Sequence, residues 1–401
     1  MLIFDGLGDR PNKELDYKTP LEAAATPNLD KLARESECGM MHTLGRGHTP
    51  GSDVAHLTIF GYDIEHCYSG RGPIEVAGLG MKLKHGDVAL RGNMGTVKDN
   101  MIVDRRAGRI RDVSPFTPDL DGMEIDGVTF IVKPGTAHRA GVIMRGEGLS
   151  SNIIDADPHK PDVPLRDVTP TDDTPEAKRT ADVLNKFLAR AHQVLNDNAE
   201  NKKRVAKGEL PANYLLVRGA GQYKHVDSFE HRYGLHPCCI AGGGLYKGVG
   251  AFLGMDIIDV PGATALPDTD VAAKFRKAVE KIKEYSFVFV HVKAADSLGE
   301  DGNPTGKRDF IAKCDKAIPI LMEVPDDVLI VVTADHSTPC EQKAHSADPV
   351  PIIFHNKSCR VDKVEAFNER ACPHGNLGFL RGLDVMPQVQ NMMNTLHLIG
   401  A

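Results

Sequence analysis

The sequence predicts an α/β fold, in which a discontinuous doubly wound core carries an inserted smaller α+β domain. The chain has 401 residues, a length at which about two domains are expected. Near both ends of the chain, short apolar runs alternate with amphipathic helical stretches, and this alternation is typical of a parallel sheet covered by helices. The middle of the chain differs, because its β-like runs are accompanied by one long charged helical stretch.

Four apolar runs are the predicted strands of the core: 2–4, 287–292, 328–332 and 350–354. Each run is short and contains almost no polar residue. Such runs are typical of strands that are buried on both faces in a parallel sheet. We therefore expect these four strands to lie parallel in one sheet.

Three amphipathic stretches are predicted helices of the same core: 26–37, 268–285 and 307–324. The first starts with Thr26, which can cap the helix, and with Pro27, which suits the first helical position. The second stretch ends just before the strand at 287, and the third precedes the strand at 328. This order gives the alternation of helix and strand that a doubly wound sheet needs.

The middle of the chain is predicted to form the inserted α+β domain. Its β-like runs lie at 86–94, 127–135, 139–146 and 213–221, and a charged helix covers 174–210. We assign residues 78–244 to the inserted domain, and residues 1–77 and 245–401 to the core.

Composition excludes several classes of protein. The net charge of −7 argues against a sequence-independent nucleic-acid binder, which needs a basic face. The eight cysteines form no C-x-x-C pair, so we expect free thiols in a reducing compartment. The sequence shows neither a signal peptide nor an apolar run near 18 residues, so we expect a cytoplasmic protein that does not bind membranes. A homo-oligomer is compatible with the sequence.

Acidic residues follow the predicted core strands directly or within a few residues. These residues are Asp5, Asp296 and Asp335. The carboxyl ends of strands form the ligand crevice of an open α/β sheet, so these side chains should converge. Converging carboxylates repel one another unless a cation neutralises them. Further candidate ligands close to them in the sequence are His336, Glu300 and His345.

The stretch TPGSDVAHL, residues 49–57, marks the predicted start of another helix. Pro50 and Gly51 break the chain, and Ser52 or Asp53 can cap the helix that follows. A serine at this position is more often a cap than a nucleophile. Its hydroxyl becomes reactive only where a base or a metal ion activates it.

A set of motifs along the chain suggests a family. The motifs are DGLGDRP, TPNLDKLARE, PGSDVAHLTIFGYD, SGRGPIE, VTADHSTPC and HSADPVP, together with DADPHK, NYLLVRGAG, IAGGGLYKGVGAFLGM and FNERACPHGNLGFLRGLD. They are spread over most of the chain and are specific in combination. With them the sequence resembles the archaeal-type cofactor-independent phosphoglycerate mutases of the alkaline phosphatase superfamily.

The resemblance implies an alkaline-phosphatase-like core and a glycolytic isomerase. Such an enzyme interconverts 3-phosphoglycerate and 2-phosphoglycerate without 2,3-bisphosphoglycerate, through a phosphoserine that would form on Ser52. It also implies two divalent metal ions, Mn²⁺ in the first place, with Mg²⁺ or Zn²⁺ as alternatives. One ion would be held by Asp5, Ser52, Asp335 and His336. The other would be held by Asp296, Glu300 and His345.

Glu300 departs from the family pattern. The family stretch reads D-x-x-G-H-D-G, whereas this sequence reads DSLGEDG, with Glu300 in place of the histidine. A carboxylate is a harder ligand than an imidazole and should favour Mn²⁺ or Mg²⁺ over Zn²⁺. We expect the glutamate to retain metal binding.

Mutase chemistry requires that the glycerate stays bound and that water is excluded. We expect the inserted domain to close over the site and to supply cations for the substrate. The candidates are Arg105, Arg106, Arg109, His138, Arg139, Arg218 and Lys247. The motif match favours Arg105, Arg218 and Lys247. Asp157 is a candidate acid, base or hydroxyl partner with His159 beside it, and Asp53 can orient the substrate.

Other functions on the same core remain open from the sequence. They are a metal-dependent phosphomonoesterase, another phosphomutase of the same superfamily, and a catalytically weakened phosphate-binding homologue. The basic cluster in the inserted domain favours the mutase, because a retained glycerate needs cationic partners. Release of free phosphate, measured beside formation of 2-phosphoglycerate, separates these functions.

Overall fold

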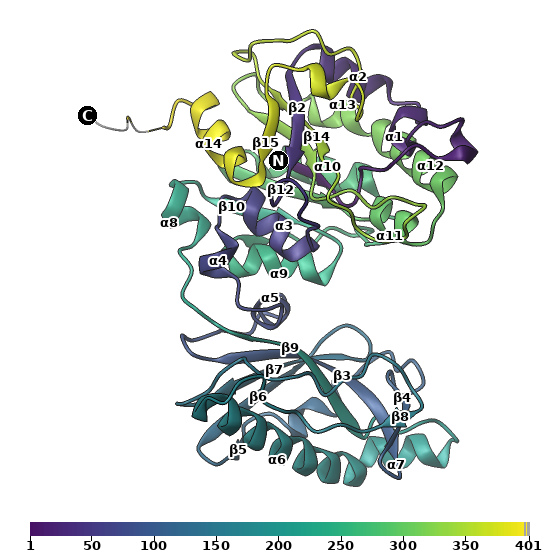
Figure 1. Ribbon diagram of the computed structural model, residues 1–401, viewed down its shortest axis with the longest axis vertical. Helices are drawn as coiled ribbons and strands as arrows, with labels where there is room; N and C mark the ends of the chain where they lie inside the picture. Colours follow the sequence, from purple (N-terminus) through teal and green to yellow (C-terminus); the bar gives the residue numbers. More distant parts are fainter. Residues whose placement is uncertain (397, 399–401) are drawn as a thin grey trace. The chain divides into compact units, whose positions relative to one another are not determined.

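The computed structural model describes residues 1–396 and 398. The chain forms two compact units, each with its own sheet (Figure 1). Unit 1 combines residues 1–66 with the chain from Asp227 onward, and unit 2 comprises Cys67–Val226. Unit 2 is therefore inserted between the two segments of unit 1.

Both junctions of unit 2 lie earlier in the chain than the boundaries 77/78 and 244/245 that we assigned from the sequence. Helix α5 (Gly72–Ala77) packs on strands of unit 2. Helix α8 (Phe229–Tyr233) and strand β10 (Pro237–Ile240) belong to unit 1, where β10 pairs with β12. Neither junction carries a shift in composition that the sequence could reveal.

Unit 1 is built on an eight-stranded sheet. In spatial order the strands are β11 (Asp256–Ile257), β10, β12 (Phe287–Val292), β1 (Leu2–Phe4), β13 (Ile330–Ala334), β14 (Val350–His355), β2 (Glu37–His42) and β15 (Gly378–Arg381). The first five strands are parallel to one another. Strand β14 is antiparallel to both of its neighbours, and β15 is parallel to β2.

The sheet is therefore mixed, and the prediction that the strand at 350–354 lies parallel to the others was wrong. The chain between β13 and β14 contains no helix. A parallel pair needs a crossover connection of a dozen or more residues, usually a helix, whereas this connection returns the chain directly. The predicted strand at 328–332 is also displaced, because β13 begins at Ile330 and ends at Ala334.

Helices cover both faces of the sheet, as the side-chain contacts of β12 show. Phe289 packs against His56 of α3 (Ser52–Ile59), with ring centroids 5.5 Å apart. The alternate residues Val288 and Val290 line a small apolar cavity with Ala278 of α10 (Val271–Lys281). Because side chains alternate along a strand, α3 and α10 lie on opposite faces. This arrangement is the doubly wound one that the sequence predicts.

The remaining helices of unit 1 are short. They are α1 (Pro20–Ala23), α2 (Pro27–Arg34), α9 (Gly244–Phe252), α11 (Ala294–Glu300), α12 (Pro304–Asp315), α13 (Ile318–Leu321) and α14 (Gly382–Met392), and α4 (Ile64–Cys67) lies at the junction. The helix predicted at 307–324 is divided into α12 and α13, with Pro319 inside the first turn of α13. A proline there cannot continue the preceding helix without losing a hydrogen bond.

Unit 2 has a seven-stranded antiparallel sheet. The strands are β5 (Met123–Ile125), β6 (Val128–Pro134), β7 (Arg139–Arg145), β3 (Val88–Lys98), β4 (Met101–Asp104) and β8 (Val163–Pro164) in spatial order, and β9 (Tyr214–Gln222) pairs with β3. The four β-like runs predicted for the inserted domain correspond to β3, β6, β7 and β9.

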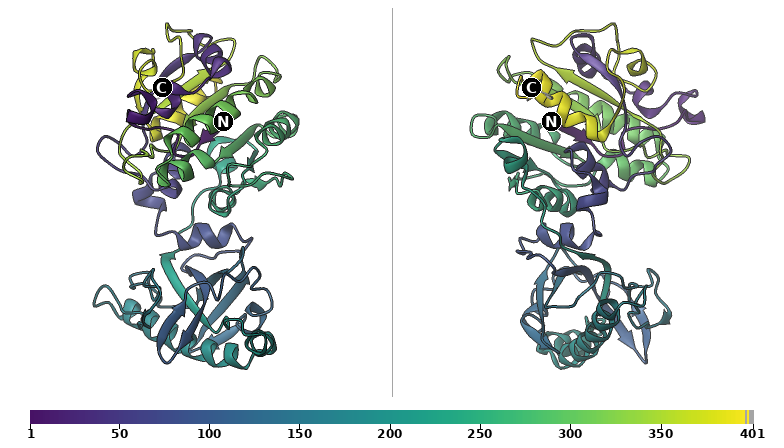
Figure 2. Two further views of the ribbon diagram at one scale, coloured as in Figure 1. Left: turned by 90° about the vertical axis from the view of Figure 1, so that its right-hand side faces the viewer. Right: turned by 60° about the vertical axis from the view of Figure 1, so that its left-hand side comes forward.

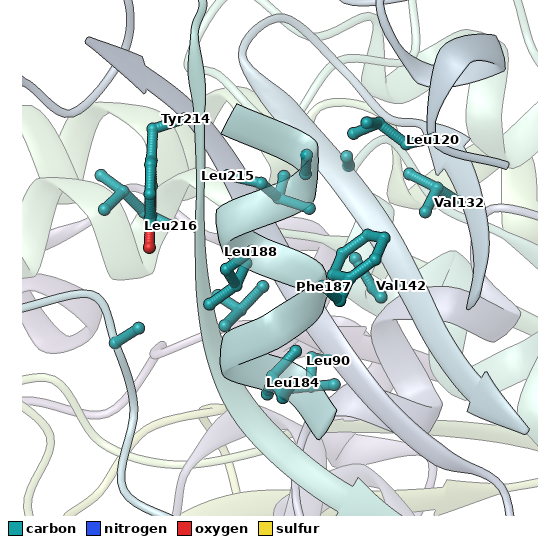
Figure 3. Packing of buried hydrophobic residues seen from close by; sticks show 14 of the residues in the cluster. Leu90, Leu120, Val132, Val142, Leu184, Phe187, Leu188, Tyr214, Leu215 and Leu216 are labelled. Atoms are coloured by element: carbon teal, nitrogen blue, oxygen red, sulfur yellow. The ribbon is translucent and has the colours of Figure 1, made fainter. Parts of the chain in front are cut away.

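The long helix α6 (Pro175–Asp197) packs on this sheet (Figure 2). Figure 3 shows Leu184, Phe187 and Leu188 of α6 among buried side chains of the strands. The predicted helix at 174–210 is divided, because Asn198 ends α6 and caps α7 (Ala199–Ala206) through its side-chain oxygen. Burial of this apolar face holds unit 2 together.

Along the described part of the chain, no helix combines the length and the apolar character that crossing a membrane requires.

Candidate active site

The carboxyl ends of three neighbouring parallel strands bring the predicted metal ligands together. Asp5 directly follows β1, and Asp335 directly follows β13. Asp296 lies in the first turn of α11, which begins just after β12. Gly6 permits this close approach, because its φ is +61° and a Cβ there would lie 2.7 Å from the backbone of Asp296.

Asp5, Asp335 and His336 form the first cluster, and all three side chains are buried. The Nε2 atom of His336 lies 3.5 Å from Oδ1 of Asp5 and 3.3 Å from Oδ2 of Asp335. Oδ1 of Asp335 accepts hydrogen bonds from the backbone N–H groups of Gly6, at 3.0 Å, and His336, at 2.9 Å. These bonds fix the carboxylate and leave its Oδ2 directed at the cluster.

Asp296, His336 and His345 form the second cluster, so His336 belongs to both. Nε2 of His345 lies 3.4 Å from Oδ1 of Asp296. Nδ1 of His345 lies 2.8 Å from the carbonyl oxygen of Pro50, which can only accept a hydrogen bond. Nδ1 is therefore the donor, and Nε2 faces the cluster. The shared histidine makes the two clusters one continuous centre.

Ser52 is the first residue of α3 and faces the first cluster. Its Oγ lies 3.1 Å from Nε2 of His336. The prediction that Ser52 or Asp53 caps this helix was wrong, because Gly51 occupies the N-cap position. The Ser52 hydroxyl is therefore directed at the cluster.

Burial and charge perturb the groups of the first cluster. Burial, followed by the charge of Asp5, raises the pKa of Asp335 well above its ordinary value. Burial lowers the pKa of His336 to about 3, so its imidazole is neutral at pH 7. Among the described residues, both carboxylate oxygens of Asp5 and Oδ2 of Asp335 are buried without a hydrogen-bond partner. Such oxygens are costly in a protein interior unless a cation or a donor satisfies them.

Lys293 carries a positive charge between the two clusters and was not among the predicted site residues. Its Nζ lies 2.7 Å from Oδ2 of Asp296 and 3.6 Å from Oδ2 of Asp5. Burial lowers the pKa of Lys293, but the charges of these two carboxylates raise it above its ordinary value. Burial raises the pKa of Asp296, but the contact with His345 and the charge of Lys293 hold it far below its ordinary value. The sequence signal that could have identified Lys293 is its place three residues before Asp296.

Three buried aromatic side chains lie behind the first cluster and were also missed. Nε2 of His291 lies 3.2 Å from Oδ2 of Asp5, and Tyr246 stacks on His291 with ring centroids 3.4 Å apart. Nδ1 of His56 donates a 2.6 Å hydrogen bond to the carbonyl of Ser52. His291 lies inside an apolar run and the other two lie inside helices, so the sequence offers no sign of their role.

Three predicted site residues of unit 1 join neither cluster. Glu300, the last residue of α11, is exposed, and partial burial and the charge of Asp296 raise its pKa. Asp53 is buried in the first turn of α3. Lys247 of α9 pairs with Asp259 at 2.5 Å.

In unit 2 the structure brings Arg105, Asp157 and Arg218 together. Arg105 donates two hydrogen bonds to Asp157, from Nε at 2.7 Å and from Nη2 at 2.6 Å. Nε of Arg218 lies 4.0 Å from the same carboxylate. Burial raises the pKa of Asp157, but the hydrogen bonds from Arg105 hold it below its ordinary value. Asp157 therefore serves as an anionic anchor among cations.

Arg91 adds to this basic cluster and was not predicted. It lies directly opposite Arg218 across β3 and β9. Burial lowers its pKa to about 10, and its Nε is buried without a partner among the described residues. Like charges directly opposite each other destabilise a sheet, and Glu75 balances part of this charge, since its Oε1 lies 3.3 Å from Nη1 of Arg91. Near it, burial and then Arg139 and Arg106 lower the pKa of His138 to about 4.

The two clusters fit divalent cations. They offer three carboxylates and two imidazoles, and the Ser52 hydroxyl lies beside them. The unpartnered oxygens of Asp5 and Asp335 are the atoms that a cation would satisfy. Oxygen-rich sites with a minority of imidazoles suit Mn²⁺, Mg²⁺ or Zn²⁺.

The chain is similar to known proteins along nearly its whole length. Residues 1–390 match the family model described as the metalloenzyme superfamily. The chain is 45% identical to 2,3-bisphosphoglycerate-independent phosphoglycerate mutase 1 of Methanocaldococcus jannaschii, over 100% of this chain and 98% of that protein. A solved structure from Pyrococcus horikoshii superposes with a TM-score of 0.86, at 34% identity, and covers 100% and 98% of the two chains. A cofactor-independent phosphoglycerate mutase from Thermoplasma acidophilum gives a TM-score of 0.74 at 36% identity, over 98% of both chains.

Proposed function

Because this chain belongs to the 2,3-bisphosphoglycerate-independent phosphoglycerate mutases of the metalloenzyme superfamily, we propose that it interconverts 3-phosphoglycerate and 2-phosphoglycerate. The observation that carries this proposal is the Ser52 hydroxyl, which lies 3.1 Å from His336 beside three buried carboxylates. A serine in such a centre can accept a phosphoryl group. As a glycolytic enzyme, the protein would act in the cytoplasm.

In the proposed reaction, Oγ of Ser52 attacks the phosphorus of the substrate and loses its proton. The bond from phosphorus to the glycerate oxygen breaks, and that oxygen takes up a proton. Ser52 then carries the phosphoryl group while the glycerate stays bound. The other glycerate hydroxyl attacks the phosphoserine and loses its proton. The bond from phosphorus to Oγ then breaks, and Ser52 regains a proton. The N-terminus of α3 supports this step, because the positive end of the helix dipole favours a phosphate on Ser52.

Two divalent ions, when bound, would lower the pKa of the serine hydroxyl and neutralise the phosphoryl oxygens. We propose Asp5, Ser52, Asp335 and His336 as ligands of one ion. We propose Asp296, Glu300 and His345 as ligands of the other. The oxygen-rich donor set favours Mn²⁺, with Mg²⁺ or Zn²⁺ as alternatives. Lys293 would keep the Asp296 carboxylate ionised.

We propose Glu300 as a metal ligand, although it is exposed. Asp296 and Glu300 are four residues apart on α11 and therefore lie on one face of the helix. Glu300→Ala should lower the Mn²⁺ affinity of the second site by roughly 10-fold, since a charged ligand is lost. Glu300→His should keep two ions and shift the preference toward Zn²⁺. Metal content and competition titrations measure both effects.

Asp301→Ala is the matched control, because Asp301 is the next residue, also acidic and exposed. This variant should bind metal as the wild type does. Unchanged metal stoichiometry and rate in Glu300→Ala would show that Glu300 is not a ligand.

We propose that the basic cluster of unit 2 binds the anionic substrate, through Arg105 and Arg218 in particular, with Asp157 as their anchor. Asp53 and Lys247 of unit 1 are proposed as further substrate contacts. Arg105→Met should raise KM for 3-phosphoglycerate by roughly 10- to 100-fold, because charge-assisted hydrogen bonds are lost. Arg111→Met, an exposed arginine of the same segment, should leave KM unchanged. Equal KM values in the two variants would contradict this assignment.

A dual assay tests the function itself. Formation of 2-phosphoglycerate and release of inorganic phosphate are measured in parallel on the same sample with Mn²⁺ present. The mutase proposal expects isomer formation to exceed phosphate release. Faster phosphate release would identify a phosphomonoesterase, and metal binding without either product would identify a phosphate-binding homologue.

A further inference from the structure

Thr338 connects the two metal clusters and has no role in the function described above. Its side chain is fully buried. Its Oγ1 lies 2.7 Å from Oδ1 of Asp296 and 3.1 Å from Nδ1 of His336. One hydroxyl therefore touches a carboxylate of the second cluster and the imidazole that both clusters share.

The backbone of Thr338 fixes this hydroxyl in place. Its N–H donates a 2.9 Å hydrogen bond to the carbonyl of Gly8. Its own carbonyl accepts a 3.0 Å hydrogen bond from Nζ of Lys307. Gly299 leaves room for it, since a Cβ there would lie 2.4 Å from the Thr338 carbonyl oxygen. Contacts with Gly8, Lys307 and Gly299 therefore fix the position of Thr338.

The direction of each proton follows from the chemistry of the partners. An ionised carboxylate only accepts hydrogen bonds, so the single hydroxyl proton of Thr338 goes to Asp296. The contact with His336 must then be a donation from Nδ1–H to Oγ1. A neutral imidazole carries one proton, and Nε2 of His336 is therefore bare. That nitrogen is the one that faces Ser52, Asp5 and Asp335.

We propose that Thr338 is a positioning residue that fixes the metal-binding tautomer of His336 and couples the two metal sites through Asp296. This inference rests on the proposed metal centre. A ligating histidine commonly donates its other N–H to an orienting group, and loss of that group typically costs 10- to 100-fold in metal affinity. Here the orienting hydroxyl of Thr338 is itself hydrogen-bonded to Asp296 of the second site. Loss of this hydroxyl should therefore weaken metal binding at both sites.

The tautomer is measured on metal-free protein by nitrogen NMR of histidine-labelled samples, with His336 assigned by its loss in His336→Gln. The wild type and Thr338→Ser, which keeps the hydroxyl, should both show His336 protonated at Nδ1. Thr338→Val has nearly the same shape without the hydroxyl, and its His336 should lose that preference. Thr333→Val is the matched control, because Thr333 is buried on β13 and its hydroxyl bonds to the carbonyl of Pro351 at 3.0 Å.

Mn²⁺ titration of the same four proteins gives the second readout. Thr338→Val should bind Mn²⁺ at least roughly 10-fold more weakly, and Thr338→Ser and Thr333→Val should bind as the wild type does. An unchanged tautomer together with unchanged affinity in Thr338→Val would overturn the inference. If the wild type binds no Mn²⁺, the proposed metal centre fails, whereas the NMR comparison still tests how Thr338 positions His336.

Discussion

Replacing Ser52 with alanine is expected to lower the mutase rate by about 10⁴-fold or more, because the reaction loses the atom that accepts the phosphoryl group. The other groups of the two clusters remain, so the variant should still bind metal ions. Its thermal unfolding should resemble that of the wild type, since the substitution removes only a small hydroxyl, which lies 3.1 Å from Nε2 of His336. The rate is measured by coupled detection of 2-phosphoglycerate.

Ser36→Ala is the control for this experiment. Ser36 is also a buried serine of unit 1, and its hydroxyl bonds to the carbonyl of Leu32, away from the clusters. Its activity should stay within about twofold of the wild type, since surface and remote changes leave transition-state contacts intact. A Ser52→Ala enzyme that retains most of its activity would contradict the proposed nucleophile.

Lys307→Met is expected to lower the free energy of unfolding of unit 1 by about 3–5 kcal/mol, because it leaves the buried carboxylate of Asp9 without its cationic partner. Lys307 and Asp9 are both fully buried at their side chains and lie 2.9 Å apart. Nζ of Lys307 also donates to the carbonyls of Gly8 and Thr338, each at 3.0 Å. This ammonium therefore joins the loop after β1 to the loop after β13, which carry Asp5 and Asp335. Urea denaturation measures the loss.

Two further variants separate the buried pair from charge loss in general. Arg10→Met breaks an exposed ion pair with Asp348 and should cost less than about 1 kcal/mol. The double variant Lys307→Met with Asp9→Asn also removes the negative charge of Asp9. It should recover part of the free energy of unfolding that Lys307→Met loses. A loss below about 1 kcal/mol in Lys307→Met alone would contradict the role assigned to this pair.

Asp5, Asp296 and Asp335 could be predicted because each follows the end of a strand. Asp5 and Asp335 come directly after β1 and β13, and parallel strands bring their carboxyl ends to one edge. The sequence does not state which strands are neighbours, so the contacts of Lys293 and Thr338 could not be foreseen. The direction of β14 was missed for a similar reason, because an apolar run reveals burial and not orientation.

The basic cluster of unit 2 was predicted only in part. Arg105 and Arg218 lie in the motifs DRRAGR and VRGAG, whereas Arg91 lies inside a strand and depends on the pairing register of β3 with β9. Register is set by tertiary packing and is not visible in a single strand. For Glu300, the motif gave its place in the sequence. The sequence did not predict that Glu300 is exposed at the end of α11.

Detection of a phosphoryl group on Ser52 is the most direct test of the proposed mechanism. The protein is mixed with 3-phosphoglycerate and Mn²⁺, quenched rapidly in acid, and examined by intact-mass and peptide-mapping spectrometry. The mechanism predicts one added phosphoryl group in the wild type, located on the peptide that contains Ser52, and none in Ser52→Ala. Turnover without any phosphorylated protein, or a phosphoryl group on another residue, would contradict it.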